Sequence, residues 1–160
     1  MKNYIILLSI LLLCGCNNKL ETVENKFNTL KDLDYSEFSN MSITNRNGVF
    51  FVNYKGEQLI VENSFFGKMI IEKKNDNDTI TDLTDNDINK IKSAIIFFEK
   101  LHILSLKVDL HQNVFITIPY SYCTYYFLKL SSNSTLESIK KQYYKPFFHN
   151  WYLYKECATR

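Results

Sequence analysis

Glycine is scarce in this 160-residue chain, which has four glycines, at Gly15, Gly48, Gly56 and Gly67. Phosphate-binding loops and dinucleotide fingerprints need several glycines within a few residues, so the sequence excludes both kinds of nucleotide site. It also contains no G-x-S-x-G motif of the serine hydrolases and no H-E-x-x-H zinc motif. The common signatures of hydrolases and nucleotide-binding enzymes are therefore absent.

A large excess of charge is missing too, because 19 Lys and Arg residues are nearly matched by 17 Asp and Glu residues. Proteins that bind DNA or RNA rely on basic surfaces, so we expect no nucleic-acid partner. No apolar run reaches the roughly 18 residues of a membrane-spanning helix. The apolar run at 4–13 follows Lys2 and has the length of a signal-peptide core rather than of a permanent membrane span.

The residues after this run form the most specific motif in the chain. Leu13, Cys14, Gly15 and Cys16 place an aliphatic residue three positions before a cysteine and a small residue directly before it. This pattern resembles the lipobox of bacterial lipoproteins. The resemblance covers residues 1–16 only, and it implies cleavage after Gly15 and lipidation of Cys16. Cleavage before Cys14 would leave the bulky Leu13 at the cut, so we reject it.

The resemblance also implies a domain organisation. Residues 1–15 form the signal peptide, residues 16–19 a short lipidated tether, and residues 20–160 an α+β domain. We expect a lipoprotein of the cell envelope, held at the membrane by its N-terminal lipid and facing the periplasm or the cell exterior. Asn17, rather than the Asp that favours inner-membrane retention in enterobacterial lipoproteins, follows Cys16. The outer membrane is therefore favoured if the cell has one.

Three segments have the features of helices. Apolar residues recur at helical spacing at Leu20, Val23, Phe27 and Leu30. This stripe predicts an N-terminal helix over 19–33. Thr84, followed by Asp85 and Asp87, has the features of a helix start and predicts one long central helix. The sequence S-T-L-E at 134–137 matches a capping box and predicts a short C-terminal helix that ends at Pro146.

Seven segments are rich in β-branched and aromatic residues, and they cover 49–54, 57–63, 67–74, 106–110, 114–118, 123–130 and 150–155. The short links between most of them favour antiparallel pairing, and the segregation of helices from strands favours an α+β fold. We expect a single α+β domain. Its antiparallel sheet has about six or seven strands and is accompanied by the N-terminal, long central and short C-terminal helices.

Lipidation of Cys16 leaves Cys123 and Cys157 as the remaining cysteines of the mature chain. An even pair outside the cytoplasm is a disulfide candidate. Two buried free thiols are an equally good interpretation, and the sequence does not separate the two.

The polar residues suggest no complete catalytic or metal site. Asp109 and His111 could share one face as metal ligands, but no third ligand is evident. Cys123, His149 and Asn150 have the residue types of a cysteine-hydrolase triad at uninformative spacing. The carboxylates clustered between 76 and 87 fail the EF-hand pattern and fit a hydrated turn followed by a helix cap. We therefore expect no catalytic residue, no metal and no cofactor.

Aromatic residues are the strongest remaining signal for a binding site. The candidate binding face consists of Tyr125, Tyr126, Trp151, Tyr152 and Tyr154. Tyr and Trp are favoured at protein interfaces because a large apolar body carries a polar group. The alternative is that these residues form ordinary core and sheet-covering positions, since aromatic residues are also common in strands.

These observations favour a non-enzymatic lipoprotein that binds another protein, for example an immunity-type lipoprotein that neutralises a toxin in the envelope. An accessory subunit of a secretion, adhesion or uptake complex is the second hypothesis. A small ligand carrier or a cryptic hydrolase is the third.

Overall fold

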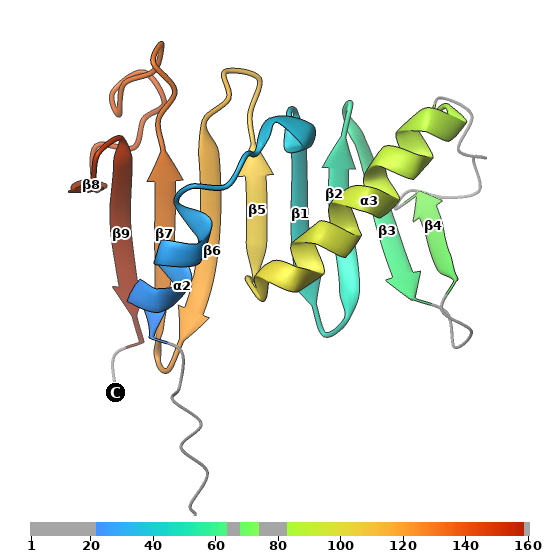
Figure 1. Cartoon of the computed structure of the whole chain (residues 1–160), viewed down its shortest axis with the longest axis horizontal. Coiled ribbons are helices and arrows are strands. Elements are labelled where there is room, and N and C mark those ends of the chain that lie inside the picture. Colours follow the sequence, from blue (N-terminus) through green and yellow to red (C-terminus); the bar gives the residue numbers. More distant parts are fainter. Residues whose placement is uncertain (1–21, 64–67, 74–82, 159–160) are drawn as a thin grey trace, which may run out of the picture.

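The structure is a computed structural model that describes residues 22–63, 68–73 and 83–158. In this part of the chain, nine strands form one antiparallel sheet, and two α-helices lie against it (Figure 1). The helices are α2 (Val23–Leu30) and α3 (Asp85–Leu101), with a short 3-10 helix, η2 (Ser36–Phe38). The strands are β1 (Met41–Arg46), β2 (Val49–Tyr54), β3 (Glu57–Asn63), β4 (Met69–Lys73), β5 (Ser105–Val108), β6 (Val114–Tyr120), β7 (Cys123–Lys129), β8 (Lys145–Phe148) and β9 (Trp151–Cys157). The predicted signal peptide (1–15), Cys16 and the tether (16–19) lie outside the described residues.

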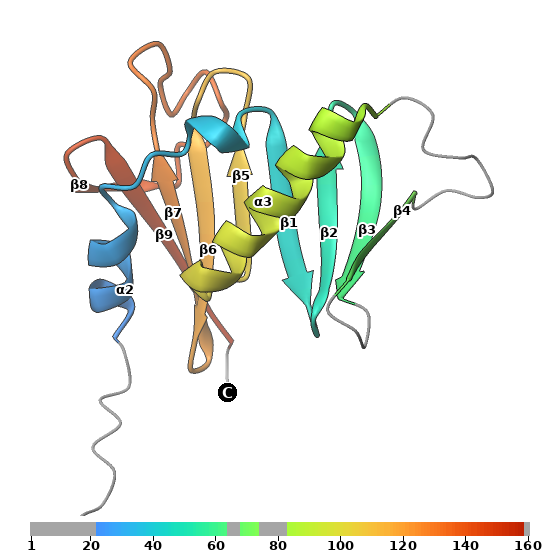
Figure 2. The ribbon, with the colours of Figure 1, turned by 45° about the vertical axis from the view of Figure 1, so that its right-hand side comes forward.

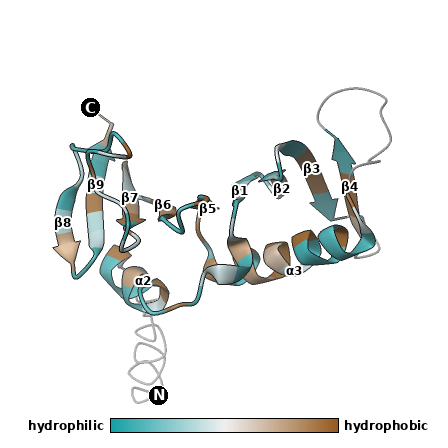
Figure 3. Ribbon diagram, turned by 90° about the horizontal axis from the view of Figure 1, so that it is seen from above, coloured by the Kyte–Doolittle hydropathy of each residue, from teal (hydrophilic) through white to brown (hydrophobic). Residues whose placement is uncertain are grey.

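The strands follow the order β4-β3-β2-β1-β5-β6-β7-β9-β8 across the sheet. Strands β1 to β4 form one meander, and the pairing of β1 with β5 joins it to a second. The second consists of β5, β6, β7 and β9, and β8 pairs with the outer edge of β9. Both helices lie on the same side of this sheet, as the view from above shows (Figure 3). The opposite side of the sheet therefore carries no described helix.

The two helices cover different parts of the sheet. Helix α3 packs on the first meander, where Phe98 meets Phe50 edge to face with ring centres 6.1 Å apart. Helix α2 comes before β1 in sequence but packs on the second meander, where Phe27 stacks on Phe127 at 4.9 Å. The sheet twists between these two regions (Figure 2), as antiparallel sheets normally do. The main core lies between the helices and this face of the sheet.

Tight two-residue turns set the register of the first meander. Asn47 and Gly48 link β1 to β2 with φ of 54° and 84°, and Lys55 and Gly56 link β2 to β3 with φ of 53° and 85°. Two consecutive positive φ values are typical of the type I′ turns that match the twist of antiparallel strands. The second residue of each turn is a glycine, which adopts this conformation without steric cost.

The prediction of an α+β domain with six or seven strands and three helices is wrong. The described chain is mostly a nine-strand antiparallel sheet with two α-helices. The S-T-L-E segment forms turns instead of the predicted C-terminal helix. Its capping residues bond locally, since the Thr135 backbone N–H donates to the Ser138 hydroxyl at 3.0 Å and the Ser138 N–H donates to the Thr135 hydroxyl at 3.1 Å. Lys140 then has a φ of 57°, which no α-helix continues through.

The sequence analysis missed strands β1 and β8 for different reasons. Strand β1 alternates buried Met41 and Ile43 with polar Ser42 and Thr44, so it resembles a polar loop when only apolar residues are counted. Strand β8 contains Pro146 and is exposed throughout. Proline removes a backbone donor but is tolerated in an edge strand, which is the position of β8.

Candidate functional site

The five aromatic residues of the predicted binding face do not form one surface. Tyr125 and Trp151 lie on the helix-covered face of the sheet, and Tyr126, Tyr152 and Tyr154 lie on the other face. Trp151 is only 2% exposed, meets Phe27 edge to face, and donates its indole N–H to the Lys31 carbonyl at 3.3 Å. It is a core residue and is not available to a partner.

The three tyrosines on the opposite face are themselves partly covered. They pack in a second apolar cluster with Leu128, Leu130 and Tyr144, and with Leu136 and Ile139 from the segment between β7 and β8. Tyr126 stacks on Tyr154 with ring centres 5.5 Å apart, and its hydroxyl donates to the Glu156 carboxylate at 3.2 Å. This cluster closes one end of the face that carries no helix.

The rest of this helix-free side, over strands β3, β2, β1 and β5, forms what we call the open face. Its outward residues are Ser42, Thr44, Arg46, Val49, Phe51, Asn53, Gln58, Ile60, Glu62, Ser105 and Lys107. Two adjoining hollows of about 360 and 150 Å³ lie here and share Ser42 and Asn53. The larger hollow reaches Lys107 and the β5–β6 turn, and the smaller one reaches Phe51 and Gln58. Together they make a continuous depression across four strands.

Basic and aromatic side chains lie around the polar centre of the open face. The Arg46 guanidinium lies 5.5 Å from the centre of the Phe51 ring, and the Lys107 ammonium lies 5.7 Å from the Phe115 ring. Leu110, which lines the larger hollow together with Lys107, is 73% exposed. The open face thus combines an exposed leucine with an arginine and aromatic rings, and aromatic residues and arginine are enriched at protein interfaces.

The most strongly perturbed carboxyl group of the described chain is Asp87, which joins the β2–β3 hairpin to the start of α3. The Lys55 ammonium lies 2.8 Å from its Oδ1, and the Tyr54 hydroxyl donates to the same atom at 3.1 Å. Its Oδ2 accepts from the Thr84 backbone N–H at 3.1 Å and from the Thr84 hydroxyl at 2.9 Å. The Lys55 contact, followed by these hydrogen bonds, lowers the pKa of Asp87 from its ordinary value of 3.8. Thr84 is the N-cap of α3, as the sequence predicted.

The lowered pKa predicts a pH dependence of stability. Because the folded state favours the Asp87 carboxylate, this carboxylate stabilises the protein above the ordinary pKa of 3.8, and the stabilisation is lost as the pH falls further towards the folded-state pKa. We expect Asp87→Asn to lower the free energy of unfolding at pH 7 and to reduce its loss between about pH 4 and pH 2. Urea unfolding at several pH values measures both effects, with Asp85→Asn as the matched control. Equal acid sensitivity of Asp87→Asn and the unmutated protein would contradict this assignment.

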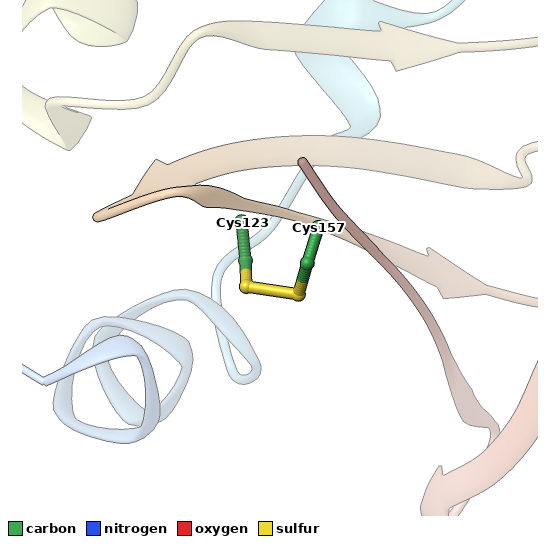
Figure 4. Close-up of a disulfide and its surroundings, with 2 residues drawn as sticks. All are labelled: Cys123 and Cys157. Carbon is green, nitrogen blue, oxygen red and sulfur yellow. A yellow bond between two sulfur atoms is a disulfide. The ribbon is translucent and has the colours of Figure 1, made fainter. Parts of the chain in front are cut away.

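Cys123 and Cys157 form a disulfide in the structure (Figure 4). They are directly opposite each other in the β7–β9 register, and their Cα atoms are 3.9 Å apart. The bond ties the end of β9 to the start of β7, and Ala158 continues the attachment by donating its backbone N–H to the Tyr122 carbonyl at 2.9 Å. The thiol of Cys123 is therefore not available as the nucleophile of a Cys123–His149–Asn150 triad.

We expect the disulfide to stabilise the fold by about 3–4 kcal/mol, from the entropy of closing a 34-residue separation in the unfolded chain. The double variant Cys123→Ser, Cys157→Ser should lose this amount in urea unfolding, and the unmutated protein should lose it on adding dithiothreitol. The reductant should leave the double variant unchanged, which serves as the control. Equal stability of the oxidised and reduced protein would show that the bond does not stabilise the fold.

The other polar candidates have structural roles. The Asp109 carboxylate accepts hydrogen bonds from the backbone N–H groups of His111 and Asn113 and from the Asn113 side chain, each at 2.9 Å. Asn150 donates its side-chain amide to the Leu130 carbonyl at 2.8 Å. Of the predicted acidic cluster, only Asp85 and Asp87 belong to the described residues. Within residues 22–63, 68–73 and 83–158, no three His, Cys, Asp or Glu side chains come together as a metal site.

No protein-family model, curated protein or solved structure matches this chain. In the described part of the chain, neither α-helix combines the length and apolar character needed to cross a membrane.

Proposed function

We propose that this protein is an envelope lipoprotein, anchored through Cys16, that binds another protein through its open face and catalyses no reaction. The observation that supports this proposal is the continuous depression across β3, β2, β1 and β5 on the side of the sheet without helices. The leader and lipobox support the envelope location. No nucleic-acid partner and no cofactor is part of the proposal.

The open face can supply both affinity and specificity. Interfaces gain most of their affinity from a few apolar, aromatic and arginine side chains surrounded by polar ones. Leu110, Phe51 and Arg46 provide such side chains, while Ser42 and Asn53 line the depression between them. With both helices packed on the opposite side, a partner can approach this face without displacing either of them (Figure 3).

An immunity-type lipoprotein is the concrete form that we favour, in which the open face covers a toxin that reaches the envelope. The small size of the described domain agrees with a protein that acts by blocking another one. A subunit of a secretion, adhesion or uptake complex is the alternative. It differs in that the partner is a resident envelope protein found in a stable multiprotein assembly.

The experiment is cross-linked affinity capture of the lipidated protein from its own membranes, comparing a variant of the open face with a matched control. The test variant is Lys107→Glu, Leu110→Ser. The control variant is Lys100→Glu, Ile96→Ser, which also changes one lysine and one exposed aliphatic residue, here on α3, where Ile96 is 48% exposed.

We expect the open-face variant to recover its dominant partner at least tenfold less well, because loss of a hot-spot residue from an interface costs about 2 kcal/mol or more. The control variant should recover the partner normally. The identity of this partner then separates a toxin from a resident complex. Equal recovery with the test and control variants would exclude the open face, and absence of any specific partner would oppose the protein-binding function itself.

A further inference from the structure

A separate hollow of about 420 Å³ lies on the helix-covered face of the sheet, between the start of α2 and strands β6, β7, β8 and β9. We call it the α2 pocket, and its lining consists of Thr22, Val23, Glu24, Tyr120, Tyr125, Phe127, Phe147 and Leu153. Phe127 is buried, whereas Phe147 is 44% exposed. The pocket is therefore apolar inside and open at one side, and it shares no residue with the open face.

Two lysines lie beside the α2 pocket on the same face of the sheet. Both Lys145, which is directly opposite Leu153 in the β8–β9 register, and Lys155 line an adjoining hollow that shares Phe147 and Leu153 with the pocket. Lys155 is directly opposite Tyr125 in the β7–β9 register, and its ammonium lies 5.2 Å from the centre of the Tyr125 ring. Tyr125 and Leu153 line the pocket, and Lys155 follows Leu153 by two residues, so it points to the same face of the sheet. Glu24 lies on the α2 side of the lining, which makes the sheet side the favourable position for a negative group.

We propose that the α2 pocket binds one long-chain fatty acid, with its alkyl chain between α2 and the sheet and its carboxylate at Lys155. An apolar cavity of about 150 Å³ is sufficient for benzene, so 420 Å³ gives room for roughly sixteen carbons in the same proportion. An apolar pocket with a cation beside it fits an amphiphile of one chain and one negative charge.

The position of the pocket also favours a ligand that comes from a membrane. Thr22 lines the pocket and is six residues from Cys16, a separation that the chain can span by at most about 20 Å. The pocket therefore remains near the bilayer in a protein anchored at Cys16. This positional argument rests on the proposed anchor, whereas the lining and the charge at the rim do not.

The test uses a palmitic acid probe that carries a photoreactive diazirine and an alkyne. The probe is added to the lipidated protein in phosphatidylcholine vesicles and to the full-length Cys16→Ser protein purified without detergent. Intact mass shows which preparation is lipidated, so failure of the anchor and failure of the pocket are seen separately. We expect saturable labelling of both proteins, on peptides that contain α2 and β7, and displacement by excess unlabelled palmitate.

Two variants test the two parts of the site. Lys155→Glu should lower labelling by the palmitic acid probe at least tenfold. It should change labelling by a second, uncharged probe made from hexadecanol less than twofold. Lys100→Glu is the control for both measurements. Val23→Trp should fill the pocket and lower labelling by both probes, with Ile96→Trp as control. Labelling outside the pocket peptides, or insensitivity to Lys155→Glu, overturns the proposal. Labelling of the Cys16→Ser protein alone also overturns it, because the chain's own lipid would then occupy the pocket.

Discussion

Phe27→Ala is expected to lower the free energy of unfolding by about 3–5 kcal/mol, the cost of removing a buried phenylalanine from a packed core. Phe27 is 3% exposed and contacts four aromatic rings, those of Phe127, Phe147, Phe148 and Trp151. It is one of only two buried residues in α2, together with Leu30. A helix of eight residues is not stable on its own, so its attachment depends on this side chain.

Urea unfolding followed by tryptophan fluorescence measures this effect, because the single tryptophan, Trp151, lies against Phe27. Phe148→Ala is the matched control. Phe148 is 40% exposed and meets the Phe27 ring only at 6.1 Å, so we expect a loss of roughly 1 kcal/mol. A loss below 1 kcal/mol for Phe27→Ala would show that α2 is not part of the cooperative core.

The sequence predicted those elements whose local signals agree with one another. The hairpin of β2 and β3 has runs rich in β-branched and aromatic residues on both sides of Lys55 and Gly56, and its predicted bounds are confirmed. Helix α3 combines the N-cap at Thr84 with a regular apolar stripe, and it too begins where the sequence predicted. In both cases the local backbone preference and the burial pattern favour the same conformation.

The total number of strands could not be predicted from the same signals, because sheet pairing depends on residues that are distant in sequence. Strand β1 is stabilised by β2 on one side and β5 on the other, and the β5 partner follows about 60 residues later. This pairing turns two meanders into one nine-strand sheet. The S-T-L-E segment shows the opposite error, since a good helix start without a buried stripe after it formed turns instead.

The candidate site was predicted in part. Successive side chains along β7 and β9 point to alternate faces of the sheet. This rule correctly indicated that Tyr125 and Tyr126 lie on opposite faces, as Trp151 and Tyr152 do. Which face is covered depends on where α2 and the segment after β7 pack, and neither contact is encoded locally. The open face was missed because its centre consists of Ser, Thr and Asn in strands that contribute their apolar residues to the core. No local pattern distinguishes such residues from a solvated sheet surface.

Cys16→Ser is expected to move the protein completely from the membrane to the aqueous fraction. The lipobox resemblance assigns all membrane attachment to the acyl chains on Cys16, each of which contributes roughly 0.8 kcal/mol per buried methylene. Two or three chains together hold a protein firmly, whereas a hydroxyl at this position accepts no thioether-linked lipid. Detergent phase separation measures the partitioning, and intact mass measures the loss of the lipid.

Cys14→Ser is the matched control, because it changes the neighbouring cysteine to the same residue and keeps the small Gly15 before Cys16. This control should remain lipidated and in the detergent phase. The reverse result, in which Cys14→Ser releases the protein and Cys16→Ser does not, would place the lipid on Cys14. If both variants stay at the membrane, an attachment other than the lipid must hold the chain. The open face would then have to be tested for membrane contact before any protein partner is sought there.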